Sequence, residues 1–139
     1  MVRRGLAALA ASIISAGALA GQHALTVFHD PACGCCTAWV EYMRDAGFAV
    51  TAVPTHRMAE VKARLAVPEG MESCHTAVAA HSGQVIEGHV PAAAITRMLD
   101  QPAVRGLAAP GMPANSPGMG PMDGTLITLD FNGRPFSRD

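Results

Sequence analysis

The sequence predicts an α/β fold in which a mixed central sheet is flanked by helices. Short segments rich in β-forming residues alternate with segments whose apolar residues recur at helical spacing, in the order β-α-β-α-β-β-α. The first strand-helix-strand unit predicts a parallel pair, and a later hairpin signal adds antiparallel strands. A Pro/Gly-dense segment near the C-terminal end interrupts the pattern. We therefore expect a mixed sheet with an irregular C-terminal segment.

Turn and cap residues mark where these elements begin and end. Asp30-Pro31 ends the first strand, because proline has no N–H to donate to a sheet. Gly47 is a favourable C-cap for the first helix, Ser82-Gly83 suits a hairpin turn, and Pro91 suits the first position of the last helix. In chain order, the expected elements are a strand at 25–29, a helix from about residue 35 to Gly47, a strand at 48–54, a helix at 58–66, paired strands at 76–80 and 84–87, and a helix after Pro91.

The C-terminal part predicts an irregular segment followed by a hairpin. Residues 107–123 (LAAPGMPANSPGMGPMD) are dense in proline and glycine and contain three methionines, a composition typical of a loop. Residues 125–131 and 134–136 form β-prone runs on either side of Asn132-Gly133, which predicts a tight turn.

Residues 1–20 are predicted to be a secretory signal peptide. Arg3 and Arg4 form a basic start, residues 5–16 are largely apolar, and Ala18-Leu19-Ala20 is a cleavage motif of the A-x-A type. A membrane-spanning helix needs about 20 apolar residues, and this run is shorter, so an uncleaved anchor is the less favoured alternative. The adjacent arginines leave the general and the twin-arginine export routes both open. We expect one mature domain, residues 21–139, in the bacterial periplasm.

The composition excludes several classes of partner and reaction. The formal net charge of −1 gives no basis for binding nucleic acid, or an anionic membrane once the signal peptide is cleaved. No acidic and basic side chains stand at a spacing suited to acid-base catalysis, so hydrolysis has no support. In an oxidising compartment, unpaired cysteines seldom persist without a function. The four cysteines are therefore the informative residues.

Three of these cysteines, Cys33, Cys35 and Cys36, stand within four positions directly after the first strand. Cys33 and Cys36 span one helical turn at a helix N-terminus, which favours thiolates and suits either a disulfide or a metal. Cys35 would invite scrambling in a simple redox pair, whereas a soft-metal site gains from a further thiolate. Two purely structural disulfides are disfavoured, because these cysteines cross-link almost no chain. Thiolates select Cu(I), with Zn²⁺ as the main competitor.

The arrangement of a Cys-x-x-Cys after the first strand, and a hairpin before the last helix, resembles the thioredoxin-like fold. In that fold a cis-proline faces the redox cysteines. Its position corresponds here to His75, which follows Cys74. The resemblance implies that Cys74 and His75 approach the loop that holds the other cysteines.

The motifs DPACGCC, SCHTA, GHVP and APGMPANSPGM are together similar to those of the CopG-type family of periplasmic copper-resistance proteins, long known as a domain of unknown function. The similarity covers about residues 25–130. It implies a thioredoxin-like fold and copper bound through the cysteines, as single ions or as a multinuclear Cu(I) cluster. It also implies a role in copper detoxification or copper redox handling, with copper ions and other periplasmic copper-handling proteins as partners.

Methionine thioethers favour copper over zinc as the bound metal. Met43, Met58 and Met98 lie on apolar helix faces and are interpreted as core residues, and Met71 in a turn is undecided. The methionines of the loop segment, which has little other apolar content to pack against, are the better ligand candidates: Met112, Met119 and Met122. Met119 ranks first among them, because it occupies the SPGM position of the family.

Among the histidines, His75 is the leading ligand candidate because it adjoins Cys74, and His89 in GHVP is second. His29 lies near the cysteine loop but would also fit as the end of a strand. The histidines interpreted as surface residues are His23, His56 and His81.

The sequence therefore predicts a periplasmic protein that holds Cu(I) for copper resistance or homeostasis. The expected metal ligands are Cys33, Cys35, Cys36, Cys74, His75 and Met119. The alternative is a thiol-disulfide or copper oxidoreductase that uses Cys33 and Cys36 as a redox pair, with Cys74 as a third redox partner.

Overall fold

The computed structural model describes residues 23–139. The expected signal peptide at residues 1–20 lies outside the described residues. Within residues 23–139, no helix combines the length and the apolar character needed to cross a membrane.

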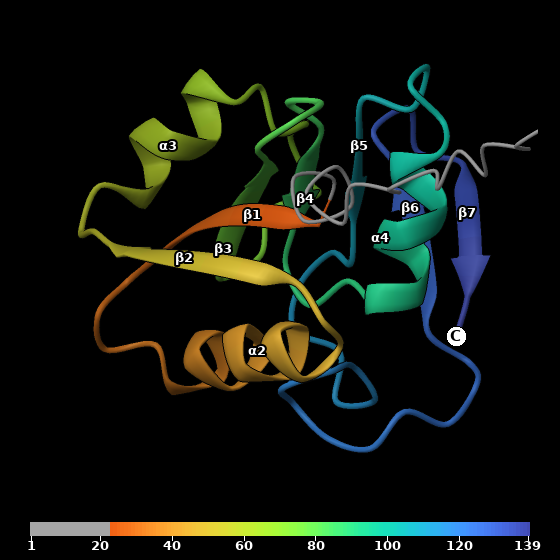
Figure 1. The fold of residues 1–139 in the computed structure, drawn as a ribbon, viewed down its shortest axis with the longest axis horizontal. Coiled ribbons are helices and arrows are strands. Elements are labelled where there is room, and N and C mark those ends of the chain that lie inside the picture. Colours follow the sequence, from red (N-terminus) through yellow and green to blue (C-terminus); the bar gives the residue numbers. More distant parts are fainter. Residues whose placement is uncertain (1–22) are drawn as a thin grey trace, which may run out of the picture.

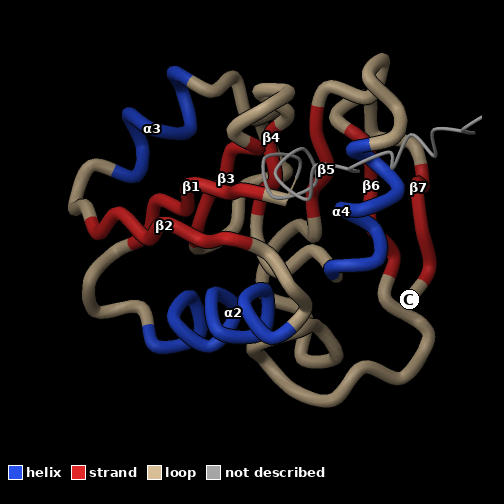
Figure 2. Tube along the Cα trace, viewed as in Figure 1, coloured by secondary structure: helices blue, strands red, loops and turns tan. Residues whose placement is uncertain are grey.

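The described chain alternates strands and helices in the predicted order and ends in a hairpin (Figure 1). Figure 2 shows that a long loop region separates β5 from β6. In chain order the elements are β1 (Ala24–His29), α2 (Gly34–Asp45), β2 (Ala49–Pro54), α3 (Met58–Arg64), β3 (His75–Ala79), β4 (Val85–Glu87), α4 (Ala92–Leu99), β5 (Gly106–Ala108), β6 (Ile127–Asp130) and β7 (Pro135–Arg138).

The strands form one seven-stranded mixed sheet in the order β2-β1-β3-β4-β5-β6-β7. β1 and β2 are parallel, as expected for a strand-helix-strand unit, and β4 and β5 are also parallel. The other neighbouring pairs are antiparallel. This confirms the mixed α/β sheet, and the β1-α2-β2 unit followed by a hairpin and a helix is compatible with the thioredoxin-like resemblance.

The two faces of the sheet pack against different helices. Alternate residues of β1 and β3, such as Val27 and Ala77, join Trp39 of α2 and Ile95 of α4 in the main core. A smaller cluster on the other face holds Val85, Ala108 and Phe131, next to side chains of the segment after α3. In Figure 1, α2 and α3 accordingly lie on opposite sides of β1 and β2.

Two local expectations were wrong. β5 falls partly inside residues 107–123, which the composition predicted to be irregular throughout. Its three residues are all buried, so they show no alternation of apolar and polar side chains from which a strand could be predicted. Pro91 is the N-cap of α4 and not its first helical residue, with ψ at 145°. The final hairpin forms around Asn132-Gly133 as predicted, and residues 109–124 contain no helix or strand.

Strand register places the candidate site at one end of the sheet. His29 is the last residue of β1, and its antiparallel partner is His75, the first residue of β3. The chain leaves His29 for the cysteine loop and reaches His75 directly from Cys74. Both cysteine segments therefore meet at this end of the sheet, beside the N-terminus of α2.

Candidate metal centre

A tight turn brings the cysteine motif to the first turn of α2. The Asp30 carboxylate accepts a hydrogen bond from the Ala32 N–H at 2.8 Å, and the Asp30 carbonyl accepts one from the Cys33 N–H at 3.0 Å. Cys33 is the N-cap of α2, and its sulfur accepts the Cys36 N–H at 3.3 Å. Cys33 and Cys36 form a disulfide, one of the two states that their spacing allowed.

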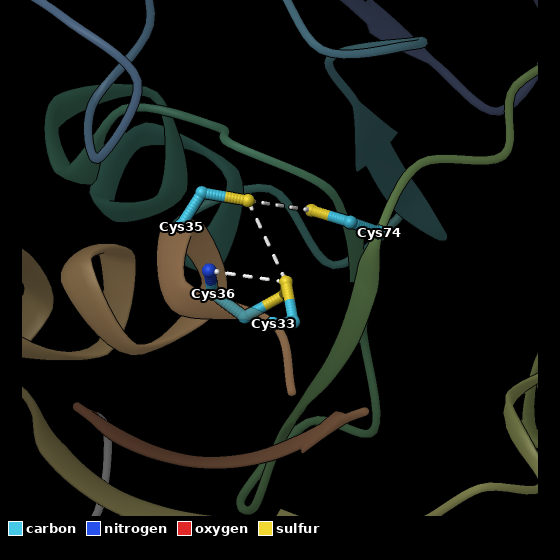
Figure 3. A group of neighbouring side chains, drawn as sticks. All are labelled: Cys33, Cys35, Cys36 and Cys74. Atoms are coloured by element: carbon cyan, nitrogen blue, oxygen red, sulfur yellow. Dashed lines mark hydrogen bonds between the residues drawn. A yellow bond between two sulfur atoms is a disulfide. The ribbon is translucent and has the colours of Figure 1, made fainter. Parts of the chain in front are cut away.

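The other two cysteines are free and lie against this disulfide (Figure 3). The Cys35 sulfur is 3.5 Å from that of Cys33 and 3.9 Å from that of Cys74. All four sulfurs lie within 4.8 Å of one another. The structure thus brings Cys74 to the other three cysteines, as the fold resemblance implied.

Two histidines extend the cluster beyond Cys74. The Cys74 sulfur is 3.0 Å from His89 Nε2 and 3.4 Å from His75 Nδ1. The ring centroid of His75 is 4.4 Å from that of Trp39 and 4.9 Å from that of His89. Sequence reasoning left His89 out of the expected ligand set, although its GHVP motif was the available signal. In the structure His89 has the shorter contact with the Cys74 sulfur.

The environment keeps both imidazoles neutral. Burial lowers the pKa of His75 well below its usual value, and the neighbouring His89 lowers it further. The pKa of His89 is also lowered, because the effect of burial outweighs that of a hydrogen bond to the Pro117 carbonyl, which raises it. His89 Nδ1 donates that bond at 2.7 Å, so Nε2 carries the lone pair that faces Cys74. His75 Nε2 is buried without a hydrogen-bond partner. A soft metal at Cys74 would therefore find imidazole nitrogen lone pairs beside the sulfurs.

Burial raises the pKa of the Cys74 thiol to about 11, and the nearby Cys35 raises it as well. The metal-free protein therefore holds Cys74 as a thiol near neutral pH. Its proton must leave when a metal binds, and the neutral His89 Nε2 is the nearest acceptor.

This pKa predicts slow alkylation of Cys74 in the metal-free protein with the disulfide intact. An increase from 9.0 to about 11 lowers the thiolate fraction near pH 8 about 100-fold. We expect iodoacetamide to modify Cys74 about 100-fold more slowly than in the urea-unfolded chain, with the rate still rising at pH 10. Peptide mass spectrometry measures both rates. A Cys74 profile that levels off at pH 9 or below would contradict this assignment.

The loop that carries Met119 packs on the same helix turn. Gly118 has φ of +84°, and a Cβ there would lie 2.8 Å from the Trp39 nitrogen and 3.1 Å from the Cys35 carbonyl oxygen. Only glycine permits this approach. Met119 is the next residue and is half-buried. The SPGM motif therefore lies over the start of α2, with its methionine next to the point of contact.

The remaining sequence candidates differ in burial and packing. Met43 and Met98 are fully buried in the main core, as predicted, and Met71 packs against the smaller cluster. Met112 and Met122 are 52% and 44% exposed. His29 is buried at the end of β1, with Nδ1 2.9 Å from the Asp30 carbonyl.

A buried polar network supports Cys74 from the opposite face of the sheet, and sequence reasoning missed it. The Glu87 side chain is fully buried and accepts the Ser73 N–H at 2.7 Å and the Thr76 hydroxyl at 2.6 Å. Lys62 of α3 forms an ion pair with the same carboxylate. Because Ser73 and Thr76 flank Cys74 and His75, Glu87 fixes the backbone that presents these two residues.

The chain is similar to known proteins in both sequence and structure. Residues 71–119 match a family described as "Protein of unknown function, DUF411". Two solved structures, titled "Copper resistance protein copG- Form 1" and "Form 2", are each 38% identical to the chain and cover 84% of it. The similarity spans 96% and 97% of those chains, with TM-scores of 0.72 and 0.73. No curated protein matches the chain.

Proposed function

Because this chain belongs to the family of the copper resistance protein CopG, we propose that it binds Cu(I) through Cys33, Cys35, Cys36 and Cys74. The observation that supports this best is the approach of all four sulfurs to within 4.8 Å of one another. Thiolate sulfurs favour Cu(I), with Zn²⁺ as the main competitor, and the nearby thioether of Met119 favours copper. Copper is the cargo of this site, and the protein would act in copper resistance or homeostasis.

Additional donors fit around the sulfurs. His75 and Met119 remain proposed ligands, and the contact between His89 Nε2 and the Cys74 sulfur adds His89 to the set. The neutral imidazoles of His75 and His89 can bind a metal without losing a proton, whereas the Cys74 thiol must lose one. Several sulfurs that bridge neighbouring ions would accommodate a multinuclear cluster.

The disulfide links copper binding to the thiol redox state. With Cys33 and Cys36 oxidised, only Cys35 and Cys74 are free to bind Cu(I). A dithiol reductant would give two electrons and two protons to this disulfide, itself becoming a disulfide, and Cu(I) would then displace the protons of the two new thiols. Oxidation of the same pair would release the metal. We place this cycle in the bacterial periplasm, after export and cleavage following Ala20, with other copper-handling proteins as donors or acceptors.

A comparison of the two redox forms tests this proposal. We expect the fully reduced protein to retain Cu(I) against a competing chelator without oxygen, and the Cys33–Cys36 disulfide form to release most of it. The readout is the copper that remains with the protein after gel filtration. Equal retention by both forms would show that Cys33 and Cys36 are not ligands.

Replacing Met119 with leucine tests the loop as part of the site. Leucine keeps the volume and apolar character but removes the thioether, so the fold should be unaffected. We expect weaker Cu(I) retention in the chelator competition, by about 10-fold. Met122→Leu, on the more exposed part of the same loop, is the matched control and should retain Cu(I) normally. Unchanged affinity in Met119→Leu would remove Met119 from the ligand set.

The disulfide also favours a second candidate function, that of an oxidoreductase. The free Cys35 sulfur is 3.5 Å from the Cys33 sulfur, close enough to attack it and exchange the disulfide. In a copper reaction, the Cys33 and Cys36 thiols would give two electrons to two Cu(II) ions, forming a disulfide, two Cu(I) ions and two protons. A readily reducible disulfide in a protein that fails to retain Cu(I) would favour this function over storage.

A further inference from the structure

We propose that Met112 is the entry ligand of the cysteine site: its thioether receives Cu(I) from a donor and passes it on to Cys74. The inference rests on the proposed function, because it names how copper reaches the site that the cysteines form. The role differs from that proposed for Met119, whose thioether would stay bound to the metal. Met112 would bind copper only in passage.

Met112 is the most exposed large apolar side chain among the described residues, at 52%. A single exposed apolar side chain is common on protein surfaces, so exposure alone assigns it no role. The backbone on both sides of Met112 is fixed, however. The Gly111 N–H donates to the Glu72 carbonyl at 3.2 Å, and the Pro113 carbonyl accepts the Ser116 N–H at 3.1 Å. The loop therefore holds an exposed thioether on an anchored backbone.

This anchor lies directly beside Cys74. The Ser73 hydroxyl donates a hydrogen bond to the Gly111 carbonyl and lies 3.9 Å from the Cys74 sulfur. Met112 follows that carbonyl in the chain, so its side chain starts one residue from a group that contacts the Cys74 sulfur. Cys74 is only half-buried. Because a methionine side chain has three rotatable bonds, its sulfur can move between solvent and this end of the sheet.

The loop that begins beside Cys74 reaches the other free cysteine further along. Gly118 packs closely against the Cys35 carbonyl, and Met119 next to it is half-buried. Burial thus increases along the loop from Met112 to Met119. Its two contacts adjoin the two cysteines that the disulfide leaves free. This order suits the passage of copper from an exposed thioether to half-buried sulfurs.

The chemistry of a thioether suits an entry ligand. Thioether sulfur is a soft donor that selects Cu(I), and it carries no proton that must leave before a metal binds. A thiol, in contrast, binds as the thiolate and releases its proton. The transfer is a ligand exchange: the bond from copper to the Met112 sulfur breaks as the bond to the Cys74 sulfur forms. The Cys74 proton leaves to His89, 3.0 Å away, and then to solvent, and no electron is transferred.

The test measures how fast the fully reduced protein takes Cu(I) from a bicinchoninate complex without oxygen, at protein concentrations where the rate still rises with added protein. Stopped-flow absorbance of the coloured complex gives the rate, and the copper retained at equilibrium gives the affinity. For Met112→Leu we expect transfer about 10-fold slower with unchanged affinity, because a ligand used only in passage changes the barrier and not the end state. Met112→His supplies an imidazole donor for copper and should restore part of the rate.

Met122→Leu is the matched control, because Met122 is also exposed, at 44%, in the same loop. Its neighbour Asp123 is anchored elsewhere, by hydrogen bonds from the Asn115 amide at 3.0 Å and the Thr125 hydroxyl at 2.7 Å. The Met122→Leu protein should take up copper at the rate of the parent.

The outcomes separate the entry role from the cysteine site itself. A Met112→Leu rate equal to that of the parent would overturn the inference and leave the cysteine site intact. Weaker retention at equilibrium would make Met112 a permanent ligand and overturn the entry role as well. An equally slow Met112→His protein would point to lost packing and not to a lost ligand. Failure of the parent to retain Cu(I) would instead contradict the proposed function, and this inference with it.

Discussion

Replacing Cys35 with serine is expected to lower Cu(I) affinity by more than about 100-fold while dithiol cycling by Cys33 and Cys36 continues. The Cys35 sulfur lies 3.5 Å from the Cys33 sulfur and 3.9 Å from the Cys74 sulfur. It therefore connects the Cys33–Cys36 pair to Cys74. Serine keeps the shape but offers a hard oxygen donor that Cu(I) does not select. Loss of supporting groups around a metal ligand alone costs about 10- to 100-fold, and this change removes a ligand itself.

Chelator competition measures the loss of affinity, and titration with a dithiol redox buffer measures the cycling. Thr37→Ser is a matched control on the same helix turn, because Thr37 is exposed. Within the described residues, its side chain makes one hydrogen bond, to the Cys33 carbonyl. It should bind Cu(I) normally. If Cys35→Ser impaired Cu(I) binding and dithiol cycling equally, Cys35 would have no distinct role as a metal ligand.

Replacing Glu87 with glutamine is expected to cause a large loss of stability, of about 3 kcal/mol. Glu87 is fully buried and pairs with Lys62, whose side chain is 15% exposed. Removing one partner of a buried pair leaves the other charge without compensation, at a cost of about 3–5 kcal/mol. We expect the lower end of that range, since water still reaches Lys62. The amide also retains fewer acceptors for the Ser73 N–H and the Thr76 hydroxyl.

Urea denaturation of the two proteins gives the difference in the free energy of unfolding. Glu60→Gln is the matched control, because Glu60 pairs with Arg57 on the surface, where both side chains are more than half exposed. Exposed pairs contribute little, so the control should unfold at nearly the same urea concentration as the parent. A Glu87→Gln protein as stable as the control would show that the buried pair does not hold the Cys74 segment in place.

The approach of Cys74 to the other cysteines was implied by the resemblance to the thioredoxin-like fold, and the strand topology supplies its physical reason. A first strand that leads into the cysteine loop, and an antiparallel strand that begins after Cys74, place both segments at one end of the sheet. The confirmed mixed sheet was predicted from the strand-helix-strand order and the hairpin signal, and the final hairpin from the Asn132-Gly133 turn.

Two features of the site depend on exact register and on the choice of sheet face: the contact of His89, which sequence reasoning ranked second among the histidines, and the Glu87 network, which it missed. His89 reaches Cys74 because the chain turns back after β4, and its distance from the sulfur depends on the hydrogen bond to Pro117 in a distant loop. Glu87 lies in the short strand β4. Its ion-pair partner, Lys62, comes from α3, on the face of the sheet opposite the main core. The GHVP motif indicated His89 as a candidate but not its distance from Cys74, and no local pattern indicates the pairing of Glu87 with Lys62, because each contact joins residues far apart in the sequence.

A thiol count under anaerobic Cu(I) loading tests the copper site most directly. The fully reduced, metal-free mature chain should yield four alkylated cysteines when alkylation is carried to completion, with Cys74 and the buried Cys36 reacting most slowly. Once loaded with Cu(I) and passed over a competing chelator, it should retain copper and protect all four from alkylation. Loss of the copper to the chelator, or continued alkylation of Cys35 and Cys74 in the loaded protein, would contradict a Cu(I) site built from these sulfurs.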